Sequence, residues 1–157
     1  MANELSTLGI KLYYAPESAA GTKPTTGFVN VPGIVSMPEL GAEPELIDVT
    51  PLEETEYTRN VPGLKTAGNF PMTANINDTF LTTWDDLMEA YETAQAAGKS
   101  LWFVVVHPKM TKAFWFTGEP VSLPLAEMAV NSAFQTTANI TVNKTEGWAA
   151  KPTIAAA

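Results

Sequence analysis

The stretch from Thr50 to Asn69 most constrains how this chain folds. It is rich in Pro, Gly, Thr and acidic residues and has no period of two or of 3.6. Strand-like segments flank it, at residues 45–50 and 70–77. Structureless connections of more than about 12–15 residues are uncommon in compact domains unless they are functional or disordered. This one is therefore predicted to be a long loop with a function, at about residues 51–69.

The loop carries apolar residues at intervals, which a disordered tether does not need. A surface loop of a monomer offers little against which such side chains can be buried. We therefore predict that the loop docks on another molecule, and we choose Arg59, the only arginine, for an ion pair between subunits. The predicted docking residues are Leu52, Glu53, Glu54, Tyr57, Arg59, Val61, Leu64 and Lys65.

One helix is predicted at about residues 84–97. Thr83 is a suitable N-cap with Asp86 three residues later, and Gly98 supplies a left-handed stop. An apolar face recurs at helical spacing, formed by Trp84, Leu87, Met88, Tyr91 and Ala94. The remainder of the chain favours short antiparallel strands. After the helix these are expected at residues 101–107, 113–117, 119–123 and 134–142.

Two of the predicted strands carry polar faces without charge. Their stripes comprise Thr73, Asn75 and Asn77, and then Gln135, Thr137, Asn139 and Thr141. Solvent-facing strands usually mix Lys and Glu into such positions, partly to block edge pairing. An ordinary wet face rich in Thr for its β-propensity is the simpler interpretation. From residue 148 the chain becomes Ala-rich, and residues 148–157 are predicted to form a flexible tail after a domain at 1–147.

Composition and motifs argue against catalysis and cofactors. The chain has no cysteine, and its only histidine is His107, with no Gly-x-Ser-x-Gly elbow in the sequence. Its glycines form neither a P-loop nor a dinucleotide fingerprint. We expect no enzyme activity, cofactor or metal site. No apolar run approaches the roughly 20 residues of a membrane span, so we expect no membrane partner.

The net charge of −8 is unevenly distributed. Residues 39–92 carry −10, whereas residues 93–157 carry +2. Affinity for nucleic acid comes mainly from Lys and Arg that neutralise phosphates. The acidic chain is therefore a poor nucleic-acid binder. Its charge serves solubility, or a surface that repels phosphate or docks on a more basic neighbour.

An ordered set of segments resembles the major tail tube protein of bacteriophages with long non-contractile tails. The set contains Ile47-Asp48-Val49-Thr50-x-Leu52, Val61-x-Gly63-Leu64-Lys65-x-x-Gly68-x-Phe70, the acid-flanked helix, strands at 101–107 and 112–118, and a final strand ending Lys144-Thr145-x-Gly147. This resemblance covers most of residues 8–147. It implies a mainly β, antiparallel sandwich or barrel-like fold with one helix.

The same resemblance implies a structural virion protein that self-assembles into stacked hexameric rings, through which DNA passes without specific binding. The loop at 51–69 would dock on the adjacent ring, and the uncharged stripes would face the lumen. Implied partners are the tape measure, tail terminator and distal tail proteins. Implied localisation is the virion tail, assembled in the host bacterial cytoplasm. Two alternatives stay open: the inner tube of a contractile injection system (a contractile phage tail, a tailocin or type VI secretion), and a monomeric β-sandwich binding or adhesion module.

Overall fold

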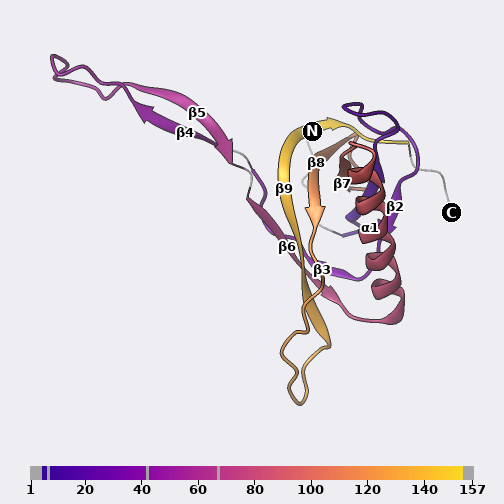
Figure 1. Cartoon of the computed structure of the whole chain (residues 1–157). Coiled ribbons are helices and arrows are strands. Elements are labelled where there is room, and N and C mark those ends of the chain that lie inside the picture. Colours follow the sequence, from indigo (N-terminus) through magenta and orange to yellow (C-terminus); the bar gives the residue numbers. More distant parts are fainter. Residues whose placement is uncertain (1–4, 7, 42, 67, 154–157) are drawn as a thin grey trace.

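The computed structural model describes residues 5–6, 8–41, 43–66 and 68–153. Within these residues the protein is mainly β with one helix, as predicted (Figure 1). Its body is a seven-stranded antiparallel sheet in the order β2-β1-β7-β8-β9-β6-β3. The strand bounds are β1 Lys11–Pro16, β2 Val29–Val31, β3 Ile34–Ser36, β6 Asn69–Asn75, β7 Leu101–Val106, β8 Lys112–Pro120 and β9 Gln135–Ala150.

The two edges of this sheet are consecutive in the sequence. Only Pro32 and Gly33 connect β2 to β3, and Gly33 has φ of +78°, which suits glycine. Because so short a connection holds the two edge strands together, the sheet curls toward a barrel. This closure protects edges that would otherwise be open to pairing with other chains.

The main core lies between the sheet and the helix α1, Asp78–Ala96 (Figure 1). Phe80, Trp84 and Leu87 of α1 are buried against alternate residues of the strands. Phe103 and Phe116, on neighbouring strands, stack with ring centroids 5.3 Å apart. Alternation of buried and exposed residues in β6 and the first half of β9 follows from the pleat, which sends successive side chains to opposite faces.

A smaller core covers the opposite face of β7 and β8. Val104, Val106, Ala113 and Trp115 are buried there, and Phe28 meets the Trp115 ring edge-on at 5.7 Å. Strand β7 is therefore apolar on both faces. This explains why residues 101–106 form an unbroken apolar run in the sequence.

The helix begins earlier than we predicted. Its N-cap is Asn77, whose side-chain oxygen accepts a hydrogen bond from the Phe80 amide at 2.8 Å. Thr83, the predicted cap, lies inside the helix and donates to the Thr79 carbonyl. The added turn forms because Phe80 extends the apolar face by four residues and becomes fully buried. The predicted stop at Gly98 is confirmed, with φ of +72°.

Two further boundaries differ from the prediction. The separate strands at 113–117 and 119–123 are one strand, β8, which ends at Pro120. Strand β9 continues to Ala150, so residues 148–150 belong to the sheet and not to a tail. They stay in register because β8 offers a pairing edge, with Phe114 opposite Trp148 and Lys112 opposite Ala150. Residues 154–157 of the predicted tail lie outside the described residues.

The predicted long loop at 51–69 is also corrected. Strands β4, Glu43–Asp48, and β5, Asn60–Thr66, pair into a separate two-stranded antiparallel sheet. Only residues 49–59 form the connecting turn. The sequence pattern does not predict β5, because the strand contains Pro62 and Gly63. Both residue types are depleted in strands and are tolerated at edges. In Figure 1 this hairpin projects far from the body, away from α1.

Candidate functional site

The β4–β5 hairpin exposes apolar side chains along its length. Among the described residues, neither β4 nor β5 contributes to the two buried core clusters. Leu52 and Leu64 are almost fully exposed. Further large apolar side chains exposed on the hairpin are Leu46, Ile47, Val49, Tyr57 and Val61. The residues that we predicted to lack burial within the monomer are therefore exposed.

An isolated two-stranded hairpin is at best marginally stable in water. Contiguous apolar surface on a soluble protein marks an interaction site when it is large and rimmed by polar residues. This hairpin is a separate two-stranded sheet with exposed apolar side chains, and charged side chains lie at its tip. Its geometry suits a segment that is covered by another molecule.

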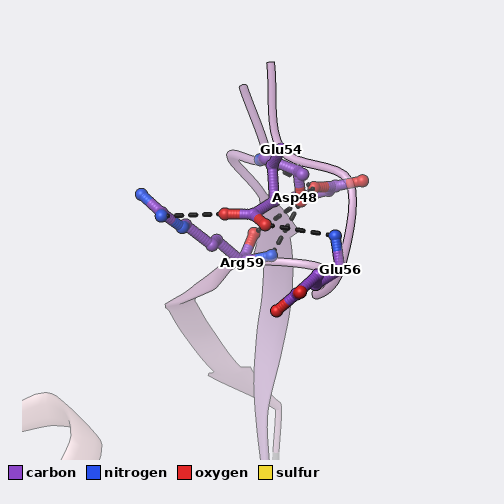
Figure 2. A network of polar contacts seen from close by, with 5 residues as sticks. Asp48, Glu54, Glu56 and Arg59 are labelled. Atoms are coloured by element: carbon purple, nitrogen blue, oxygen red, sulfur yellow. Dashed lines mark hydrogen bonds and ion pairs between the residues drawn. The ribbon is translucent and has the colours of Figure 1, made fainter. Parts of the chain in front are cut away.

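Hydrogen bonds give the tip of the hairpin a defined shape (Figure 2). Asp48 accepts from the Thr50 amide at 2.9 Å and from the Thr50 hydroxyl at 2.6 Å. The Thr50 hydroxyl in turn accepts from the Arg59 amide at 2.7 Å. These contacts join the end of β4 to the residue that precedes β5. A segment ordered before docking loses less conformational entropy when it docks.

Glu54 organises the remainder of the tip (Figure 2). Its carboxylate accepts from the Glu56 amide at 3.2 Å and pairs with the Arg59 guanidinium at 2.9 Å. The Glu56 amide, followed by other backbone amides and Arg59, holds the pKa of Glu54 below its ordinary value. Hydrogen bonds from Thr50, the hydroxyl first, lower the pKa of Asp48 in the same way. Both carboxylates therefore stay charged at neutral pH.

Arg59, our choice for an ion pair between subunits, has an intramolecular partner in Glu54. Its side chain is 64% exposed, so part of the guanidinium faces solvent. Of the other predicted docking residues, Glu53 and Lys65 are exposed and Glu54 is half-buried. The hairpin brings all eight predicted residues together on one projection.

The uncharged polar stripes meet on one face of the sheet. Thr73 lies opposite Thr137, and Asn75 lies opposite Gln135, whose amide donates to the Asn75 side chain at 2.9 Å. Asn139 and Thr141 continue this face along β9. The alternate residues of both strands face the main core. Six of the seven predicted residues therefore share the face turned away from that core.

Asn77 is the exception within this set. Its side chain caps α1, and the residue lies beyond the end of β6. The sequence placed it in the stripe because Thr73, Asn75 and Asn77 continue an alternation of two. That alternation ends at Asn75, where the backbone leaves the strand.

Sequence reasoning missed a second exposed apolar segment, the connection at 121–134 between β8 and β9. Its exposed large side chains are Val121, Leu125, Met128, Val130 and Phe134. The sequence contains a signal for such a segment. Apolar residues recur there without the period of a strand or a helix, in a stretch that contains Pro124 and Asn131. The pattern predicts strands only at its start and its end.

His107 has a structural setting. Its Nδ1 accepts from the Lys109 amide at 3.1 Å, and its Nε2 lies 2.7 Å from the Ser6 carbonyl oxygen. A neutral imidazole protonated on Nε2 satisfies both contacts. Within the described residues, no three His, Cys, Asp or Glu side chains cluster as metal ligands would. The part of the chain that the structure describes contains no helix long and apolar enough to cross a membrane.

Solved structures with a similar fold include chains of two assemblies. One similar chain belongs to the cryo-EM structure of the anti-feeding prophage baseplate, sixfold symmetrised, with 7% identity and a TM-score of 0.57. That match covers 97% of this chain and 98% of the other. A second belongs to the tail of an empty GTA particle, computed with helical refinement and C6 symmetry. Its identity is 12% and its TM-score 0.55, over 94% of this chain and 99% of the other.

At such identities the likeness concerns the fold alone. No protein-family model matches the chain. No curated protein matches it in sequence at a significant level.

Proposed function

We propose that this protein is a structural virion protein that self-assembles into stacked hexameric rings, forming the tube of a phage tail through which DNA passes. The observation that carries the proposal is the β4–β5 hairpin, which projects from the body with its apolar side chains exposed. A ring stacked on an identical ring provides a surface for it. Such head-to-tail contacts are heterologous and continue from ring to ring.

The likeness to solved structures supports this proposal at the level of the fold. The two chains compared above occur in assemblies with sixfold symmetry, and the matches span nearly the whole of each chain. The protein would occupy the virion tail after assembly in the host cytoplasm. Tape measure, tail terminator and distal tail proteins would be its partners, and no catalytic step, metal or cofactor is part of the proposal.

The uncharged face of β6 and β9 would line the lumen in this arrangement. Binding to DNA derives mainly from cations that neutralise phosphates. A wall of Thr, Asn and Gln offers no such cation. DNA would therefore pass along it without being retained.

Negative-stain electron microscopy combined with analytical ultracentrifugation tests the proposal. We expect the purified protein to form rings and tubes at high concentration without nucleotide or metal. A species of monomer mass at every concentration, with neither rings nor tubes, would overturn it. That outcome would favour the monomeric binding module.

A second location within the same kind of assembly is supported by one comparison. The anti-feeding prophage chain belongs to a baseplate, and 98% of it is covered. A baseplate subunit would form rings that do not repeat into long tubes, and microscopy of the same samples distinguishes the two. An inner tube of a contractile system would also form tubes, but it would bind a co-expressed sheath protein.

A further inference from the structure

The two ends of β9 present different surfaces. The strand runs over 16 residues, which at about 3.3 Å per residue corresponds to roughly 50 Å along the chain. At its start Gln135 pairs with Asn75, and at its end Ala150 pairs with Lys112. The segment at 121–134, which we call the excursion, precedes the first end, so we name it the excursion end. The second end lies beside an apolar groove, and we name it the groove end.

The excursion is an ordered projection. Hydrogen bonds hold the side of the excursion that follows β8. The Val121 carbonyl accepts from the Trp84 indole at 3.1 Å, and the Pro124 carbonyl accepts from the Thr136 hydroxyl at 2.8 Å. A turn at Ala129–Ser132, with Asn131 at φ of +62°, forms part of its middle. Figure 1 shows it extending from the body beyond the ends of β8 and β9.

Apolar side chains on this projection face solvent. Val130 is 90% exposed, and Leu125, Met128 and Phe134 are at least half exposed. Glu127 is the only charged residue between Val121 and Phe134. Ordering an apolar projection in water is unfavourable unless it is covered. This surface therefore requires a complementary apolar site.

Such a site lies at the groove end. An apolar groove of about 210 Å³ extends from Trp148, near the end of β9, toward the middle of the strand, where Phe70 pairs with Ile140. It is lined by Met37, Pro38, Leu40, Phe70, Val105, Phe114, Phe116 and Trp148. Trp148 meets Phe114 edge-on at 5.5 Å and remains 62% exposed. Sites for small-molecule ligands typically measure about 300–1,000 Å³. This groove is smaller and suits one or two side chains.

The charges of the two ends are complementary. Exposed lysines gather at the groove end by strand register and chain position: Lys11, Lys109, Lys112 and Lys151. They outnumber the two acids there, which are Glu39 beside the groove and Glu146, paired with Lys23 at 3.0 Å. Exposed acids lie toward the excursion end: Asp78, Glu119 and Glu127. Opposite charges on facing surfaces guide association and set the orientation of the partners. A second copy of this chain supplies both the apolar and the charged match.

We propose that residues 125–134 of the excursion of one copy occupy the Trp148 groove of a copy in the next ring. The inference rests on the proposed function and adds a second contact between rings to that of the hairpin. Trp148 lies 13 residues along β9 from Gln135, so Val130 of the excursion does not meet Trp148 of its own chain. A head-to-tail contact covers both apolar surfaces with one interface that repeats along the stack.

Cysteine cross-linking tests this contact, because the natural chain contains no cysteine. The variant carrying Val130→Cys and Trp148→Cys is assembled and then oxidised. We expect most of the protein to shift from the monomer band to a ladder that extends beyond six subunits on non-reducing gels. A mixture of the two single variants should give a cross-linked dimer that neither variant gives alone. Met37→Cys replaces Trp148→Cys in a second variant, in case the loss of the indole disturbs the groove.

The matched control pairs Val130→Cys with Gln95→Cys, an exposed position on α1. It should remain monomeric on the same gels. Tubes that form without the Val130–Trp148 ladder would overturn this contact and leave the proposed function intact. A ladder that stops at six subunits would also overturn it, since it would place the contact within a ring. Absence of both tubes and cross-links would overturn the inference and the proposed function together.

Discussion

Gly118 shows how one residue sets the approach of two strands. It lies at an irregularity in the β8–β9 pairing, where a Cβ atom would come within 2.6 Å of the Ile140 side chain and 2.9 Å of the Thr141 carbonyl oxygen. We expect Gly118→Ala to destabilise the protein by about 1–3 kcal/mol, the usual cost of forcing atoms into a packed core. Gly41→Ala, at a position with open space, is the control and should be nearly neutral. Urea denaturation measures both, and equal midpoints would contradict the expectation.

Asp48 gives the hairpin tip a dependence on pH. Hydrogen bonds from Thr50 hold its pKa below the ordinary 3.8, so their stabilisation is present above that value and is lost as pH falls through the lower, folded pKa. We expect the Thr50 amide resonance to titrate with an apparent pKa below 3.8. Asp48→Asn keeps an acceptor oxygen and should abolish this titration. A midpoint above 3.8 in the wild type would show that the network is absent in solution.

At the scale of elements, the cap at Asn77 determines where α1 begins. Asn77→Ala removes the acceptor for the Phe80 amide and should cost about 1 kcal/mol of stability. Asn77→Asp keeps an acceptor and should retain most of it. Thr83→Ala, at the site where the sequence suggested a cap, should be nearly neutral, because alanine is favoured inside a helix. Denaturation midpoints that rank Thr83→Ala as the costlier change would place the helix start near residue 84.

The hairpin is an element whose stability depends on what covers it. Replacing residues 49–59 and both strands with a short Gly/Ser linker should leave the domain folded, since loop length changes closure entropy only slightly. Circular dichroism should keep its signal while microscopy shows no stacked rings. As a milder variant, Leu64→Ser should weaken stacking without affecting the fold. Long tubes formed without the hairpin would exclude its docking role.

At the scale of the whole molecule, charge on the shared face of β6 and β9 would be repeated around a ring. Thr137 is exposed on this face. Thr137→Lys would place a circle of lysines in each layer, and release of counterions would then favour DNA retention. We expect tubes of this variant to retain DNA at moderate salt, whereas wild-type tubes release it. Thr137→Gln is the uncharged control, and co-sedimentation with labelled DNA is the measurement.

That expectation depends on which face lines the channel. Equal DNA retention by the lysine and glutamine variants would contradict the expectation, since the added lysines would then lie where DNA does not reach them. Firm retention by wild-type tubes at physiological salt would contradict the low adhesion of an uncharged wall.

The sequence by itself determined the features that depend on neighbouring residues. Alternation in β6 and β9 defined their polar faces, helical spacing from Trp84 to Ala94 defined one face of α1, and Gly98 ended it. Apolar residues within a Pro- and Gly-rich stretch also indicated a segment that needs a partner. These signals are local, because pleat, helical turn and left-handed backbone each act within a few residues.

The tertiary structure decided what depends on distant partners. Phe80 adds a turn to α1 because a core pocket receives it, and β9 reaches Ala150 because β8 offers a matching edge. Strand β5 exists through its pairing with β4, despite Pro62 and Gly63. The Trp148 groove joins residues from five separate segments. Pairing and burial between residues so far apart in the sequence depend on how the whole sheet curls. Local sequence patterns do not predict that.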